Sequence, residues 1–275
     1  MKSASPSAFY DSGANPSLNH VPGALQYTHI ALDWISNQKS TSMMWLSGES
    51  RVLTTSIAQT MAEVCDSGPR KRLLTTFFFS KSDPSRNSAK HFVTSLAYGI
   101  IQSVPSSRAA IAHAVEKDPL VISGSIEMQF DKLILQPLIQ LNLANQSSTL
   151  PYVIIIHALD ECEDASARIQ ILRILERFDT ARLSSHKRLL WKIVVMSTPD
   201  RAISEAVGSL RSVISCIVQP GPRDEHDLWG GQKLSPTHGL LALSMPKFLP
   251  SILQFRPPRL LSIGECAKPR HSHFL

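Results

Sequence analysis

Short apolar runs alternate with helical periodicity over most of the chain. Five runs have strand length and are rich in apolar, β-branched or aromatic residues: 43–46, 73–79, 152–156, 192–196 and 213–218. Apolar residues recur at helical spacing in the segments between and around them: 28–35, 56–65, 89–103, 105–116, 126–143, 165–178 and 201–210. Strands that alternate with helices are joined by right-handed crossovers, so the pattern predicts a parallel sheet.

The run Tyr152 to Ile156 (YVIII) is apolar without interruption. Such a run is typical of a central parallel strand that is covered on both faces. We therefore expect an α/β fold in three layers, with helices on both faces of the sheet. Pro137 lies inside the long helical segment and predicts a kink there.

The two ends of the chain lack this alternation. Residues 1–24 are rich in Ser, Pro, Asn and Gly and predict an extended lead-in. Residues 219–275 contain eight of the eighteen prolines and five glycines, without clear periodicity. The sequence thus predicts one domain over residues 25–218, followed by an irregular, loosely structured tail.

Composition and charge favour a globular protein without a nucleic-acid site. Hydrophobic residues make up 43% of the chain and charged residues 18%, a balance that allows a buried core. The net charge is +6, but the tail, with seven Lys or Arg and four Asp or Glu, carries half of it. Scattered positive charge indicates a mildly basic surface and argues against nucleic acid as a partner.

Cysteine usage and hydropathy bear on location. The four cysteines are isolated, which argues against a structural zinc site or a disulfide framework. The first twenty residues are polar and do not resemble a signal peptide. The longest apolar runs are shorter than the roughly 18 residues that a membrane helix needs. We expect no membrane contact and a cytoplasmic location.

Four motifs follow one another along the predicted strands. They read WLSGESRVLTTSIAQT from Trp45, FFFSKSDPSRNSAK from Phe77, IIIHALDEC from Ile154 and IVVMSTP from Ile193. Together they resemble the NACHT domain of large fungal signalling NTPases, also described as a nephrocystin-type N-terminal domain. The typical patterns there are WLxGPAGAGKSAIAQT, FFFSRSDPxRNxAK, a strand ending in DALDEC and a strand ending in TSRP. The resemblance covers about residues 8–218.

This resemblance implies a P-loop NTPase-like fold of the STAND class, which binds ATP or GTP with Mg²⁺. Intact relatives act as switches in intracellular defence or programmed-death signalling. The motif order supports the resemblance, but several of the residues that perform the chemistry differ in this chain.

The phosphate-loop window differs most. A working loop reads G-x-x-x-x-G-K-[ST], where backbone N–H groups and the Lys hold the phosphates and the hydroxyl binds Mg²⁺. Here only Gly48 and Thr55 match, while Leu53 and Thr54 replace the second Gly and the Lys. Arg51 is the remaining cation in the window. Loss of a charged contact to phosphate costs about 2–3 kcal/mol of binding free energy. We therefore interpret the window as a vestigial cofactor-binding set made of Gly48, Arg51, Thr54 and Thr55.

The acidic motif and the last strand are altered as well. The resemblance implies an Asp that binds Mg²⁺ at position 157, but His157 stands there; the other vestigial metal position is Thr55. Imidazole is a poor ligand for a cation that prefers hard oxygen donors. Asp160 and Glu161 remain as vestigial catalytic acids. Thr198 replaces the Arg that senses the γ-phosphate in the family.

Each of these residues also has a purely structural interpretation. Gly48 is explained equally well as a turn glycine, and His157 as a packed histidine at a strand end. Asp160 and Glu161 suit the cap of the helix that follows. Cys162 near His157 suggests a thiol nucleophile, but no third group supports that chemistry.

We therefore expect a degenerate NACHT-type module of an intracellular signalling protein, which has no cofactor and acts in binding or regulation. Its partners would be intact NACHT-type relatives or other signalling proteins. One alternative is a weak NTP-binding or NTP-hydrolysing switch that uses Thr55, Asp160 and Glu161 with Arg51 as its cation. Another is a truncated gene product without function.

Overall fold

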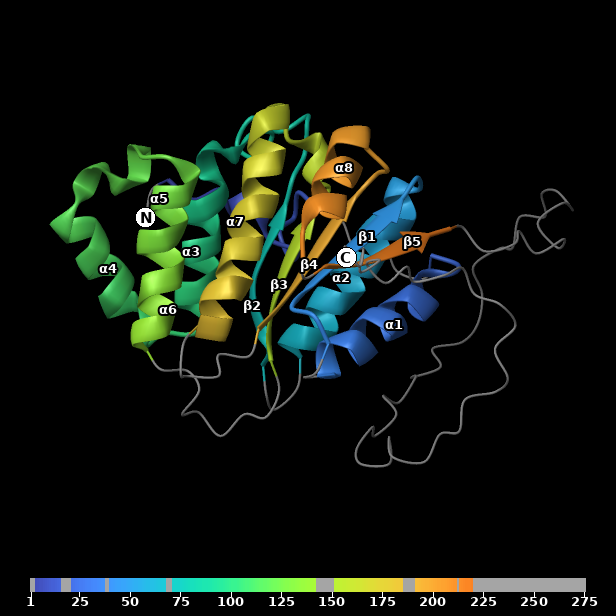
Figure 1. The fold of residues 1–275 in the computed structure, drawn as a ribbon, viewed down its shortest axis with the longest axis horizontal. Helices are drawn as coiled ribbons and strands as arrows, with labels where there is room; N and C mark the ends of the chain where they lie inside the picture. The colour runs from blue at the N-terminus through green and yellow to red at the C-terminus, as the bar shows by residue number, and fades with distance from the viewer. Residues whose placement is uncertain are drawn as a thin grey trace, which may run out of the picture. The chain divides into compact units, whose positions relative to one another are not determined.

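A five-stranded parallel sheet carries the fold (Figure 1). The computed structural model describes residues 3–15, 21–37, 40–67, 71–141, 151–184, 191–211 and 213–219. The strands are β1 (Met43–Gly48), β2 (Leu73–Phe78), β3 (Tyr152–His157), β4 (Trp191–Ser197) and β5 (Val213–Val218). Their order in the sheet is β2-β3-β4-β1-β5. The parallel sheet, with β3 beside β4 and β4 beside β1, confirms the fold predicted from the sequence.

The strand side chains alternate between two separate cores. In β3, Ile154 and Ile156 belong to one apolar cluster, and Val153 and Ile155 belong to the other. Neighbouring strand residues point to opposite faces of a sheet, so an uninterrupted apolar strand must be covered twice. This is the reason why the continuous apolar run predicted a three-layer fold, which the structure confirms.

Helices supply the two outer layers (Figure 1). One core contains residues of α1 (Ala24–Ser36) and α2 (Arg51–Asp66). The other contains residues of α3 (Phe92–Ser103), α4 (Ser107–Lys117), α5 (Ile126–Phe130), α6 (Gln136–Gln140), α7 (Ala165–Ser184) and α8 (Arg201–Ser209). Short 3₁₀ segments are η1 (Pro6–Ala8), η2 (Ala89–His91), η3 (Pro119–Ser123) and η6 (Leu159–Glu161).

The kink predicted at Pro137 takes the form of a π-helical segment. The segment η4 (Asp131–Leu135) joins α5 directly to α6 and ends two residues before the proline. Proline has no N–H to donate to the preceding turn, and a wider π turn is a common local adjustment inside a helix.

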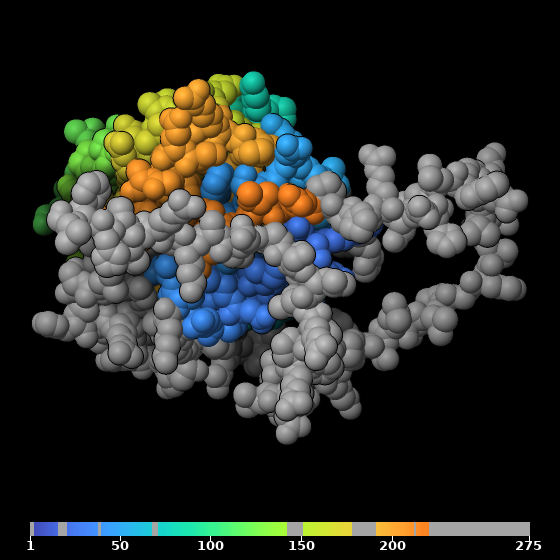
Figure 2. All heavy atoms as spheres, turned by 45° about the vertical axis from the view of Figure 1, so that its right-hand side comes forward, coloured from blue at the N-terminus to red at the C-terminus, as the bar shows by residue number. Residues whose placement is uncertain are grey.

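The strand β5 forms one edge of the sheet. In Figure 2 its orange atoms reach the surface beside the blue amino-terminal helices, and the Ile217 side chain is 66% exposed. No helix within the described ranges is long and apolar enough to cross a membrane.

The start of one helix and the form of the lead-in differ from the sequence expectations, and the tail lies almost wholly outside the described residues. The helix predicted from Ser56 begins five residues earlier, at Arg51, which changes the candidate site. Residues 3–15 of the lead-in form turns and a 3₁₀ segment with a buried residue, Ala8, and so are not simply extended. The predicted loose tail, apart from Gln219, lies outside the described residues.

Candidate functional site

The candidate site lies where the carboxyl ends of β1, β3 and β4 meet. Because the strands are parallel, their carboxyl ends share one edge of the sheet, the usual position of ligand sites in such folds. Arg51 enters this edge from the first turn of α2, and Asp160 and Glu161 enter it from η6 after β3. Thr198 follows β4. The fold therefore brings together residues from three of the four motifs.

The phosphate-loop window is mostly helical. Helix α2 begins at Arg51, and the Ser50 hydroxyl caps it by accepting a hydrogen bond from the Leu53 N–H at 3.3 Å. Arg51 and Leu53 stand where the family pattern has glycine, so the residues between Ser50 and Thr55 contain no helix breaker. The Leu53 N–H is bonded to the Ser50 hydroxyl, and the Thr54 N–H donates to the Ser50 carbonyl at 3.0 Å, so these two N–H groups are not available to a phosphate.

Two of the predicted phosphate-binding residues have structural roles here. The Thr54 side chain is buried, and its hydroxyl donates to the carbonyls of Ser50 and Arg51 at 3.3 and 3.1 Å. A Cβ atom on Gly48 would lie 2.9 Å from Cβ of Val218 and 3.1 Å from Cγ2 of Thr54. The glycine is thus explained by the close approach of β1 to β5 and α2.

Arg51 forms ion pairs with both remaining acids. Its Nη1 lies 2.5 Å from Oε1 of Glu161, and its Nη2 lies 3.5 Å from Oδ2 of Asp160. The arginine side chain is 59% exposed, whereas those of Asp160 and Glu161 are 8% and 16% exposed. Ion pairs with so exposed an arginine contribute about 1 kcal/mol or less to stability. They matter through the position of Arg51, because its guanidinium faces the acids that would serve a metal–nucleotide complex.

The two carboxylates are held by further hydrogen bonds. Asp160 accepts from the Thr198 N–H at 3.0 Å and from the Thr198 hydroxyl at 2.7 Å. Glu161 accepts from the Lys81 N–H at 2.9 Å. Ala158 adopts the left-handed conformation, with φ of 55°, and turns the chain between β3 and η6. Asp160 thus ties the end of β3 to the end of β4, and Glu161 ties it to the segment after β2.

The idea that Asp160 or Glu161 caps the next helix is wrong. Asp164 performs that role for α7, because its carboxylate accepts from the N–H groups of Ser166 and Ala167 at 2.8 and 3.2 Å. The acidic pair is therefore free of a capping role and serves the strand ends.

His157 is a neutral, packed histidine. Burial lowers its pKa to about 4; Asp160 opposes this shift, and Arg51 and Arg86 add to it. Thr55 donates its hydroxyl hydrogen to the Arg51 carbonyl at 2.7 Å, so its oxygen accepts from Nε2–H of His157 at 3.3 Å. The two metal candidates predicted from the sequence therefore contact each other.

His157 also packs against an aromatic ring, and the thiol suggested by the sequence as a nucleophile, Cys162, is buried. The imidazole packs against the ring of Phe78, with ring centroids 4.9 Å apart. Burial raises the pKa of Cys162, and its sulfur contacts the Asp164 carbonyl at 3.8 Å. A buried thiol with a raised pKa is a poor nucleophile.

The donor set does not fit the Mg²⁺ ion that the fold family implies. Mg²⁺ prefers hard oxygen ligands such as carboxylates, but position 157 supplies an imidazole and Thr55 already binds that imidazole. Within the described ranges, no group of three or more His, Cys, Asp or Glu side chains is arranged to hold a metal ion.

A family profile matches the region that contains this site. The profile described as nephrocystin 3, N-terminal, matches residues 26–197, more than half of the chain. The chain belongs to the nephrocystin 3 N-terminal family. The match confirms the resemblance inferred from the motifs and identifies a NACHT-type domain. A search of curated proteins found no match.

Several residues around the site of this nephrocystin 3 N-terminal domain escaped the sequence analysis. Ser50 was not recognised as a helix cap, although a serine followed by a segment without Gly or Pro is a helix-start signal. Lys81 acts through its backbone, which no sequence signal reveals. Asp83 and Arg86 were noticed only as part of a motif, and their partners lie in the lead-in.

Proposed function

We propose that this chain is a NACHT-type module that no longer binds or hydrolyses nucleotide and acts in protein binding or regulation. The observation that carries the proposal is the start of α2 at Arg51, with its guanidinium set against Asp160 and Glu161. A helix in place of the loop removes the concave arrangement of N–H groups that holds phosphates. The arginine also neutralises the acids without a metal.

The side chains support the same proposal. Thr54 cannot supply the positive charge that a lysine gives to the phosphates, and its hydroxyl is used by the backbone of α2. His157 is neutral at pH 7, because its pKa is about 4. Neither residue replaces the charge that the family uses at its position, so phosphate and metal each lose a principal contact.

The proposed partners follow from the family. A NACHT-type domain without a working site would act by contact with other proteins, either intact NACHT-type relatives or other signalling proteins of the cytoplasm. Co-precipitation of the full chain with an intact relative would test this part of the proposal. The result of this co-precipitation does not depend on whether the chain binds nucleotide.

We expect the full chain to show no saturable binding of ATP or GTP with Mg²⁺ tighter than about 10 μM, or roughly −7 kcal/mol. Isothermal titration calorimetry checks this, with a hydrolysis assay in parallel. Saturable binding below that concentration would contradict the proposal. It would favour a weak NTP-binding switch built from Thr55, Asp160 and Glu161, with Arg51 as the cation.

Restoring the family residues should recover nucleotide binding. We expect the variant Arg51→Gly/Leu53→Gly/Thr54→Lys/His157→Asp to bind MgATP about 30- to 150-fold more tightly than the natural chain, the worth of one charged phosphate contact. The two glycines let the first turn of α2 open, and the lysine and aspartate supply the missing charges.

The matched control keeps Arg51 and carries only the other three substitutions. We expect it to bind more weakly than the fourfold variant, because the guanidinium still faces Glu161. Circular dichroism would verify that both variants fold. If both fold and neither binds nucleotide, the loss of these residues does not explain the loss of binding.

A further inference from the structure

Residues 3–15 are docked on the domain through hydrogen bonds. The Ser3 carbonyl accepts from His91 at 2.8 Å and from the Thr94 hydroxyl at 2.9 Å, and the Ser5 N–H donates to the Ser95 hydroxyl at 2.8 Å. This segment precedes the region that matches the family profile. The contacts fix it against the start of α3.

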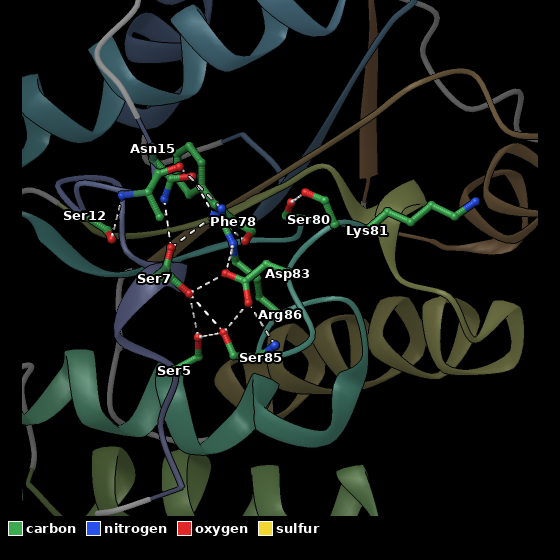
Figure 3. Close-up of polar contacts among 12 residues, drawn as sticks. Ser5, Ser7, Ser12, Asn15, Phe78, Ser80, Lys81, Asp83, Ser85 and Arg86 are labelled. Carbon is green, nitrogen blue, oxygen red and sulfur yellow. Dashed lines mark hydrogen bonds and ion pairs between the residues drawn. The ribbon is translucent and has the colours of Figure 1, made fainter.

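A buried arginine forms the centre of the docking site. We call Asp83, Ser85 and Arg86 the cradle (Figure 3). The Arg86 side chain is 7% exposed. Its Nη1 donates to the Ser7 carbonyl at 3.0 Å and to the Asn15 side-chain oxygen at 2.5 Å, and its Nε donates to Asp83 at 2.9 Å. One guanidinium therefore joins the interior of the docked segment, at Ser7, to its last residue, Asn15.

The acidic side of the cradle receives hydroxyl groups. Asp83 accepts from the hydroxyls of Ser7 and Ser85, both at 2.7 Å, and from the Ser85 N–H at 2.9 Å. Burial alone would raise the pKa of Asp83, but these bonds and Arg86 lower it to about 2. The carboxylate is therefore ionised at neutral pH, and Ser7 donates to it from the lead-in (Figure 3).

The cradle is continuous with the candidate site. The Ser80 N–H donates to the Arg86 carbonyl at 3.2 Å, and the next residue, Lys81, donates its N–H to Glu161. At the other end of the same loop, the Asn87 carbonyl accepts from the Glu163 N–H at 2.8 Å. The loop that Arg86 holds thus bonds to Glu161 and to Glu163, two residues further along the chain.

We propose that residues 3–15 form a removable strap whose docking in the cradle fixes the position of Glu161. Within residues 3–15 Ala8 is the only apolar side chain that is fully buried. Phe9 packs against Tyr98 with ring centroids 5.9 Å apart, and Tyr10 packs, partly buried, against one of the two cores. Segments with few buried apolar contacts open at lower free energy than the core does. Release of the strap frees the loop of residues 79–88 and with it the Arg51–Glu161 pair.

This inference does not depend on whether the site binds nucleotide. The cradle takes a polar peptide that presents a serine hydroxyl to Asp83 and backbone or amide oxygens to Arg86. The occupant seen here is the chain's own lead-in, and a peptide of the same sequence is the matching ligand in trans.

Hydrogen exchange in the full chain tests the strap. The double variant Ser7→Ala/Asn15→Ala removes two strap side chains that contact the cradle. We expect about tenfold faster amide exchange in residues 3–15, in residues 79–87 and in residues 159–163. The control Ser12→Ala changes a strap hydroxyl whose hydrogen bond to a described residue is accepted from the Ala14 N–H at 3.3 Å, away from the cradle, and should leave all three segments unchanged.

A synthetic peptide of residues 3–15 gives the second measurement. Added in excess to the double variant, it should restore slow exchange in residues 79–87, whereas a scrambled peptide should not. Two results would overturn the inference. In the first, the strap exchanges faster while residues 79–87 and 159–163 stay as in the natural chain. In the second, the double substitution leaves the strap itself protected, which shows that the cradle does not hold it.

Discussion

Replacement of Arg86 by alanine is expected to lower the free energy of unfolding by about 2–3 kcal/mol, because a buried charged donor is lost while Asp83, which is 26% exposed, stays partly solvated. The Arg86 side chain is 7% exposed and donates to Asp83, Ser7 and Asn15. It also donates to the Phe78 carbonyl at 3.4 Å. Without the guanidinium, these oxygen atoms remain partly buried and each loses a hydrogen-bond donor.

Urea denaturation of the purified full chain measures this effect. Arg86→Lys keeps a positive charge but cannot reproduce a planar fork with several donors, so its loss should be smaller. Arg108→Ala, at an exposed position of α4, should change stability by no more than about 0.5 kcal/mol. Equal losses for Arg86→Ala and Arg108→Ala would show that the cradle is not a stabilising centre.

His157 is expected to make the protein less stable as the pH falls from about 6.5 to about 4. Burial holds its folded-state pKa near 4, below the ordinary value of 6.5. The unfolded chain therefore binds a proton in this interval and the folded chain does not. The stability linked to His157 is complete above pH 6.5, and roughly 3 kcal/mol of it is lost by pH 4.

The comparison of pH profiles isolates this contribution. Because asparagine does not titrate, His157→Asn should be less stable than the natural chain at pH 7 but should lose less stability between pH 6.5 and 4. His113→Asn removes an exposed histidine of α4 and should keep the slope of the natural chain. If His157→Asn also keeps that slope, the imidazole titrates normally and is not the buried neutral group described above.

The strand pattern was sufficient to predict the sheet. An uninterrupted apolar run such as Ile154 to Ile156 can be stable only between two covering layers, because its side chains alternate between the faces. Helical segments between the strands then require crossovers and parallel pairing.

The candidate site was only partly predictable. The motifs contain Arg51, Asp160, Glu161 and Thr198, and the structure brings these four residues together at the carboxyl ends of the strands. The sequence did not predict that Arg51 lies in a helix and faces both acids, because the family pattern imposed a loop on residues that have no loop-forming glycine. Local helix preference decided the backbone there, against the resemblance.

The sequence by itself determined the fold class and the family, because each depends on residue type and order, and in it Leu53, Thr54 and His157 differ from the family pattern. Only the tertiary structure decided which contacts these positions and their neighbours make. The pairing of Arg51 with Glu161 and the docking of Ser7 and Asn15 on Arg86 join segments that are distant in the sequence. Such contacts depend on where the sheet places its loops, and this position is set by the packing of the whole domain.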